Sequence, residues 1–140
     1  MNARIREAIF KAAQKEPLAV TFGMTLVELG DGFSAVEMLC RADMMDNLFG
    51  RTHGGAIYSL IDEAFETAAQ TDGTVCVALN VNVSYVVSPE PGSTLRAEAK
   101  RISQTRKTAG YEIRVSDRAG TLVANCQATA YRTGKPLPFL

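Results

Sequence analysis

The feature that most constrains the fold of this chain is a helix-forming stretch that is apolar around most of its circumference. The stretch opens with Gly54 and Gly55 and runs to about Gln70. Its apolar side chains are Ala56, Ile57, Tyr58, Leu60, Ile61, Ala64, Phe65, Ala68 and Ala69. They cover an arc of roughly 220°, whereas a surface helix needs a stripe of only about 100° or slightly more. Either a strongly curved sheet or a second chain must therefore close the remaining side.

The part of the chain after this helix has the alternation that is typical of β-strands. Between residues 75 and 87, large side chains recur at every second position and share one face. They are Val75, Val77, Leu79, Val81, Val83, Tyr85 and Val87. Shorter alternating stretches follow at 95–99, 111–115 and 122–130, with turn-forming residues between them. Four successive strands with short connections predict an antiparallel sheet that has one apolar face to cover.

One helix and two strands are predicted ahead of the central helix. Apolar residues recur at helical spacing from Ile5 to Ala13, Asn2 is suited to cap that helix, and Pro17 should end it. Strands are predicted at 24–29 and 33–39, on either side of a Gly-Asp-Gly turn. The resulting order, α-β-β-α-β-β-β-β, predicts an α+β fold.

Length and charge indicate a single domain and exclude two classes of partner. The 140 residues suit one domain over 1–140, with residues 134–140 expected as a loose C-terminal tail. The net charge is zero, which argues against a protein that binds nucleic acid by bulk electrostatics. No apolar run approaches the ~20 residues of a membrane span. Charges run through the N-terminal stretch, which argues against a signal peptide.

The cysteines and the single histidine argue against disulfides and against a metal site. The cysteines are Cys40, Cys76 and Cys126. Their odd number and the lack of C-x-x-C spacing fit a reducing, cytoplasmic compartment. Scattered thiols with one histidine are a poor zinc set, and Asp43 and Asp46 alone supply too few oxygen ligands for a hard cation. We therefore expect no metal.

The start of the central helix combines groups that could act on a carbonyl. Backbone N–H groups at Gly54 and Gly55 are free at a helix start, where the helix dipole is positive, and glycine lets a substrate approach closely. An N–H directed at an oxygen that becomes negative forms an oxyanion hole. Asp62, two turns further along, lies beside Tyr58 and Phe65, where partial desolvation favours a more reactive base. It could attack the carbonyl itself or activate a water.

Each of these residues also has a purely structural interpretation. His53 could simply cap a turn, Asn47 could be an ordinary loop residue, and Asp62 could be a carboxylate bonded to backbone. Glu63 and Glu66 are expected to point toward solvent. An isolated buried charge is costly, however, so an aspartate on an otherwise apolar helix favours a functional role.

Two further groups of residues are candidates for binding the rest of a substrate. Met45 and Phe49, together with Tyr58 and Phe65, could line an apolar pocket, although the first two could equally pack a dimer. Three basic residues lie around a predicted hairpin turn, and they could hold phosphate groups or simply be solvated. These are Arg101, Arg106 and Lys107.

The region before and within the central helix resembles the signature of hotdog-fold acyl-CoA thioesterases. The matching residues are Asn47, Gly50, His53, Gly54 and Gly55, followed by Asp62 nine residues after His53. The pattern is most similar to the phenylacetic-acid-degradation (PaaI-like) subfamily, and the resemblance covers about residues 15–133, which would form the core of the domain. It implies an antiparallel sheet wrapped around the central helix at about 54–70.

The resemblance also implies an assembly and a set of roles. Subunits of such enzymes pair sheet edge to sheet edge, dimers usually form tetramers, and the active site lies between subunits. Gly54 would donate its N–H to the thioester carbonyl, and Asp62 would reach in from the partner as nucleophile or general base. Asn47 would orient the carbonyl or water, and His53 would support the loop or the thioester. Gly55 would contact the substrate, and basic residues near the surface would meet the nucleotide end.

The chain departs from the pattern after the central helix. Some relatives carry a hydroxyl residue there to hold the attacking water, whereas this chain has Val-Ala-Leu-Asn at 77–80. That role is either absent or moved to Asn80 or Thr74.

These observations predict a cytoplasmic, homo-oligomeric acyl-CoA thioesterase that needs no cofactor, because coenzyme A is part of its substrate. Two alternatives remain open at this point. One is a hotdog enoyl-CoA hydratase or dehydratase, and the other is a non-catalytic acyl-CoA-binding module. The sequence leaves open the acyl group, the choice between dimer and tetramer, and the choice between covalent attack and general-base catalysis.

Overall fold

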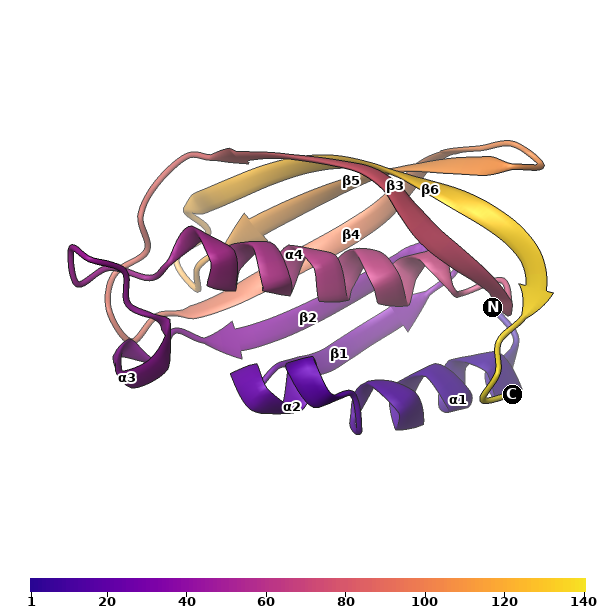
Figure 1. The fold of residues 1–140 in the computed structure, drawn as a ribbon, viewed down its shortest axis with the longest axis horizontal. Coiled ribbons are helices and arrows are strands. Elements are labelled where there is room, and N and C mark those ends of the chain that lie inside the picture. The colour runs from indigo at the N-terminus through magenta and orange to yellow at the C-terminus, as the bar shows by residue number, and fades with distance from the viewer.

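The computed structural model describes all 140 residues as one curved antiparallel sheet wrapped around a long helix (Figure 1). The helices are α1 (Ala3–Ala13), α2 (Pro17–Phe22), α3 (Ala42–Met45) and α4 (Gly54–Ala69). The strands are β1 (Thr25–Gly30), β2 (Phe33–Leu39), β3 (Thr74–Tyr85), β4 (Thr94–Gln104), β5 (Thr108–Ser116) and β6 (Leu122–Pro136). The strand order is β1-β2-β4-β5-β6-β3. This arrangement confirms the predicted α+β hotdog fold. None of the helices is both long and apolar enough to cross a membrane.

Helix α4 lies in the hollow of the sheet and forms the centre of the core. Leu60, Ile61, Ala64 and Ala68 are completely buried, and the helix packs mainly against β2 and β4. Burying one large aliphatic side chain contributes about 1.5–3 kcal/mol, so the wide apolar arc is what holds the helix in place. At its end, the Gln70 amide bonds both backbone groups of Cys76, at 3.0 and 2.9 Å, and so fixes the exit into β3.

Strand β3 differs from the single apolar stripe that alternation predicts. Its pairing with β6 shifts by one residue between Ala78 and Asn80, which is a β-bulge. Because a one-residue shift moves side chains to the opposite face, Val77 and Leu79 are 47% and 61% exposed, whereas Cys76 is buried. β3 is also an edge strand with β6 as its only neighbour, so it presents apolar side chains along an unpaired edge.

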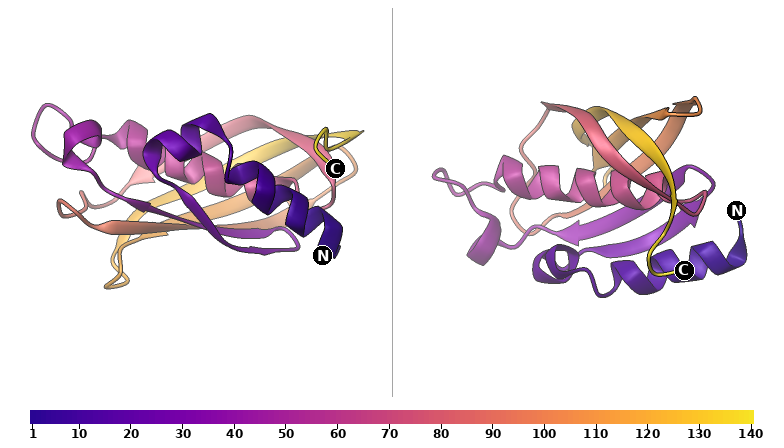
Figure 2. Two further views of the ribbon diagram at one scale, coloured as in Figure 1. Left: turned by 90° about the horizontal axis from the view of Figure 1, so that it is seen from below. Right: turned by 45° about the vertical axis from the view of Figure 1, so that its right-hand side comes forward.

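The two ends of the chain differ from the predictions as well. Pro17 does end the first helical segment, but it also begins α2. Proline is favoured at the first helical position because the N–H that it lacks would have no hydrogen-bond partner within the helix. Residues 134–140 are not a loose tail. β6 continues to Pro136, the Leu137 N–H bonds Gly73 O at 3.1 Å, and Leu137 is buried against Ile9 of α1. Figure 2 shows this C-terminal segment turning back beside α1.

Candidate active site

The first turn of α4 is built by the histidine that precedes it. His53 is the N-cap, and its Nδ1 accepts the Gly55 N–H at 2.8 Å. Nδ1 is therefore an acceptor, which places the proton of the neutral ring on Nε2. A Cβ on Gly55 would lie only 3.1 Å from Nδ1, so the close cap favours glycine there. The capping role considered for His53 is thus present, and it occupies the Gly55 donor.

The Gly54 N–H is the donor that remains free at this helix start. It makes no hydrogen bond within the chain, whereas the Ala56 N–H bonds His53 O at 3.0 Å. The Gly54 carbonyl accepts the Tyr85 hydroxyl at 3.0 Å, and a Cβ on Gly54 would lie 3.3 Å from Tyr85 Cζ. Tyr85, at the end of β3, is a component of the site that sequence reasoning missed, because only the curvature of the sheet brings it to the helix start.

Asn47 shapes the loop that leads into the helix. Its Oδ1 accepts the backbone N–H groups of Phe49 and Arg51 at 2.9 and 3.1 Å, which identifies that atom as the oxygen. Its Nδ2 has no acceptor within the chain and remains available as a donor. Asn47, Gly54 and Tyr85 all line one pocket of about 220 Å³ at the helix start. The structure therefore brings two of the predicted catalytic residues together.

Asp62 lies in a different pocket, halfway along α4. The side chain is half-buried in a hollow of about 210 Å³, which it shares with Phe65, Cys76 and Val77. Burial raises the pKa of the Asp62 carboxyl, and the nearby Glu16 carboxylate raises it further. Burial followed by the charge of Asp62 also raises the pKa of Tyr58. A desolvated carboxylate of this kind is a stronger base than an exposed one.

Three carboxyl groups gather beside Asp62, and this cluster was not predicted. Oxygen atoms of Glu16, Glu63 and Glu66 lie within 4.8 Å of one another. Glu63 is only 5% exposed, which corrects the expectation that it points to solvent. Burial and then the Glu16 carboxyl raise the pKa of Glu63 to about 9. Glu66 is exposed, as predicted, but partial desolvation and the Glu16 carboxyl raise its pKa to about 7. Glu16 comes from the link between α1 and α2, so the spacing of residues along α4 could not reveal that this link buries Glu63.

The separation between Gly54 and Asp62 limits what one chain can do. Eight residues of α-helix rise roughly 12 Å. A hydrogen bond to a thioester carbonyl and attack on its carbon require both groups within about 3–3.5 Å of the reacting atoms. One thioester carbonyl therefore cannot contact both the Gly54 N–H and the Asp62 carboxylate of the same chain.

The candidate substrate-binding residues are dispersed. Met45 is buried in the core, whereas Phe49 is 83% exposed at the tip of the loop before α4. Arg101 is paired with Asp31 at 3.0 Å, and Lys107 lies over the Tyr131 ring. Arg106 is exposed. The hairpin between β4 and β5, which carries the last two basic candidates, lies at the opposite end of the sheet from the loop before α4 (Figure 1).

Neither candidate for the displaced hydroxyl role faces Asp62 within the chain. Thr74 Oγ1 donates to Asp72 at 2.6 Å. Asn80 lines a separate polar hollow with Asn82 and Thr129. The residue of that stretch that lines the Asp62 pocket beside Val77 is Ala78, which has no hydroxyl.

Comparison with known proteins agrees with this fold. Residues 49–124 match the Thioesterase superfamily, and the chain belongs to that superfamily. Within it, the chain is a PaaI-like hotdog protein. A protein of Archaeoglobus fulgidus, classed only provisionally as an esterase, is 30% identical over 138 residues, which are 99% of this chain and 87% of that one.

The similarity to PaaI is seen with an Escherichia coli protein sequence and with a solved E. coli structure. The acyl-coenzyme A thioesterase PaaI of strain K12 is 28% identical over 121 residues, which are 86% of each chain. The solved structure of the E. coli PaaI protein from the phenylacetic acid degradation operon superposes with a TM-score of 0.90. It is 26% identical and covers 95% of this chain and 96% of its own.

Proposed function

We propose that this chain is an acyl-CoA thioesterase whose active site is completed by a second copy of the chain. The observation that carries the proposal is that two candidate catalytic groups lie at separate places along α4. A free Gly54 N–H begins the helix, and a desolvated Asp62 lies two turns further on, in a separate pocket. Each pocket therefore contains only one of the two groups that thioester hydrolysis requires, the oxyanion donor or the base. The names of the E. coli and A. fulgidus relatives support the same reaction class.

The unpaired edge of β3 supports a homodimer. An edge strand with exposed Val77 and Leu79 is a ready surface for pairing with another strand. A two-fold axis through this edge would set the two α4 helices antiparallel, so the start of each would lie beside the middle of the other. Gly54 of one copy and Asp62 of the other would then meet at one thioester. Pairing of such dimers into a tetramer would follow the resemblance to the family.

The proposed reaction uses groups of the chain and no metal or additional cofactor. The thioester oxygen accepts the Gly54 N–H, and the free Asn47 Nδ2 is a second donor at the same pocket. These donors and the positive helix end stabilise the oxyanion of the tetrahedral intermediate. Asp62 either takes a proton from a water as that water attacks the carbonyl carbon, or attacks that carbon itself. The intermediate then expels the coenzyme A thiolate, which takes up a proton. In the first route this releases the acid directly, whereas in the second it leaves an acyl anhydride on Asp62, and a water hydrolyses that anhydride to the free acid and the Asp62 carboxylate.

The nucleotide end of coenzyme A would be held by basic residues supplied by the oligomer. Arg106 and Lys107 are accessible candidates, whereas Arg101 is already engaged by Asp31. We also place the enzyme in the cytoplasm, which is supported by three buried cysteines with free thiols.

Release of free thiol from a panel of alkyl- and aryl-CoA thioesters tests the proposal. We expect turnover by the wild type and a loss of at least ~10²-fold in Asp62→Asn, the lower limit for a catalytic base. The matched control is Ser59→Ala, because Ser59 lies on the same helix and its hydroxyl bonds only Gly55 O. Thermal unfolding should show both variants to be folded.

Three outcomes would overturn the proposal. Undiminished turnover by Asp62→Asn would remove Asp62 from the mechanism. Conversion of an enoyl-CoA without release of thiol would indicate a hydratase. Tight binding of acyl-CoA without any turnover would indicate a binding module.

A further inference from the structure

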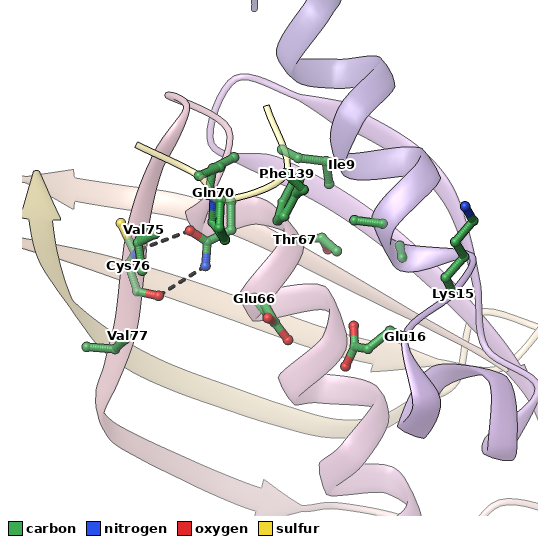
Figure 3. A pocket seen from close by; sticks show the side chains of 14 residues that line it. Ile9, Lys15, Glu16, Glu66, Thr67, Gln70, Val75, Cys76, Val77 and Phe139 are labelled. Carbon is green, nitrogen blue, oxygen red and sulfur yellow. Dashed lines mark hydrogen bonds between the residues drawn. The ribbon is translucent and has the colours of Figure 1, made fainter. Parts of the chain in front are cut away.

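A second hollow adjoins the pocket of Asp62 and lies between α1, α4, β3 and the C-terminal segment (Figure 3). Its volume is about 460 Å³, and it shares Glu66, Cys76 and Val77 with the Asp62 pocket. Pockets that bury small molecules measure roughly 300–1,000 Å³, so the Asp62 pocket of about 210 Å³ falls below this range by itself. The two hollows together fall within the range.

The lining of this second hollow suits an apolar group. Ile9 and Ala13 of α1, Val75 of β3, and Leu137 and Phe139 of the C-terminal segment contribute apolar surface. Figure 3 shows Phe139 lying beside Ile9 and above Thr67, on the side away from Val77. The far wall is therefore made by the two ends of the chain.

Few polar groups inside the hollow have a hydrogen bond left for a ligand, although the exposed Lys15 also lines it. Both amide atoms of Gln70 are bonded to the backbone of Cys76. The Glu16 and Glu66 carboxyls face one another across the edge of the hollow (Figure 3). The pKa of Glu66 is raised to about 7, which reduces the negative charge at that edge near neutral pH. An apolar group could pass this edge at lower cost than it could pass two fully ionised carboxylates.

We infer that this hollow is the acyl chamber of the enzyme. It receives the apolar end of an acyl group whose thioester lies beside Asp62, and the wall where Phe139 lies beside Ile9 (Figure 3) sets the longest acyl group that fits. The preferred substrates thus carry apolar acyl groups much longer than acetyl. This inference rests on the proposed function, since it extends the site that contains Asp62.

Two substitutions change the chamber in opposite directions. Ala13→Phe fills it and Phe139→Ala enlarges it, and Phe139 is 46% exposed, so its truncation should leave the fold intact. Leu140→Ala is the matched control, because Leu140 is the neighbouring residue but lines a different hollow. The quantity to measure is kcat/KM for butyryl-, octanoyl- and dodecanoyl-CoA.

The expected result is a shift in preference for acyl length. Ala13→Phe should lower the octanoyl-to-butyryl ratio of kcat/KM at least ~10-fold, the low end for one methylene group in an apolar pocket. Phe139→Ala should raise the dodecanoyl-to-octanoyl ratio, and Leu140→Ala should match the wild type. Ratios that are equal in all four proteins would overturn the chamber while leaving the thioesterase proposal intact. So would a change of oligomer size in Ala13→Phe without a change of ratio, because the hollow would then be a subunit contact.

A binding measurement separates the chamber from the reaction. If the wild type released no thiol from any thioester, the proposed function would fail, and calorimetric titration with octanoyl-CoA would still test the chamber. Weaker binding to Ala13→Phe than to Leu140→Ala would support an apolar ligand site at this place. Equal affinities would overturn it.

Discussion

Gly54 and Gly55 are adjacent and chemically identical, yet their N–H groups differ in hydrogen bonding. The N–H of Gly55 is occupied by the His53 cap, and that of Gly54 is free. The His-Gly-Gly sequence therefore combines a helix cap with a free N–H, which is the oxyanion donor of the proposed reaction. This distinction depends on one side-chain rotamer, which no spacing rule in the sequence could reveal.

The Gly54 donor can be removed without breaking the helix. Proline is favoured at the first helical position, and His53 has the extended backbone, φ −61° and ψ 137°, that a residue before proline requires. We expect Gly54→Pro to lower kcat by ~10²–10³ relative to Gly54→Ala, since removal of one oxyanion-hole donor typically has that effect. Steady-state kinetics of the two variants checks this. Gly54→Ala adds the same Cβ beside Tyr85 and keeps the N–H, so equal rates would show that the donor is unused.

The His53 cap makes a separate prediction about stability. We expect His53→Ala to lower the free energy of unfolding by about 1 kcal/mol, because the Gly55 N–H loses its acceptor, and His53→Asn to restore most of it. Denaturant unfolding of the three proteins measures this difference. Equal stability of the wild type and His53→Ala would show that the histidine is not needed as a cap.

At the scale of elements, the contact between the α1–α2 link and α4 should respond to pH. The pKa of Glu63 is 4.5 in an unfolded chain and is raised to about 9 in the fold. Between these values the unfolded chain has released a proton that the folded chain retains, so stability falls as pH rises from about 4.5 to about 9. The carboxyls that face Glu63 are Glu16, Glu66 and Asp62, and Glu66 adds a smaller effect of the same sign up to about pH 7.

Urea unfolding of the wild type and Glu63→Gln across this pH range tests the prediction. The amide retains the shape of the side chain but cannot titrate, so the variant should lose less stability with pH and be the more stable protein at pH 8. Glu98→Gln is a suitable control, since Glu98 is exposed on the sheet and pairs with Arg96. Parallel pH profiles for the wild type and Glu63→Gln would contradict the raised pKa.

The sequence predicted well those elements that are determined by the spacing of apolar residues within one short segment. The apolar arc of α4 and the order of the strands follow from spacing, and so do the Asn2 cap and the Gly54 helix start. The wrong expectations depend on contacts between distant segments. The bulge near Leu79 exposes residues that strict alternation would bury, and Leu137 is held by α1 and by the turn before β3. Burial of Glu63 likewise requires Glu16, which lies far away in the chain.

At the scale of the whole molecule, a site shared between copies can be tested by mixing inactive variants. Gly54→Pro and Asp62→Asn should each be poorly active alone. In a dimer containing one of each, a single site retains both native groups, so an equal mixture should recover about a quarter of wild-type activity by random pairing. Co-expression with two different affinity tags and tandem purification isolates the mixed dimer. Activity no higher than the mean of the two parents would show that donor and base act within one chain.

The unpaired edge of β3 has a consequence for how the protein behaves when it is scarce. If catalysis requires that edge to be joined to another, then a chain alone holds two half-sites and no complete one. The rate per chain would decline on dilution. Below the dissociation constant of the dimer, the rate per chain would be proportional to the total concentration, and the total rate to its square. The total protein concentration would then control activity, because it determines by mass action what fraction of the chains is dimeric.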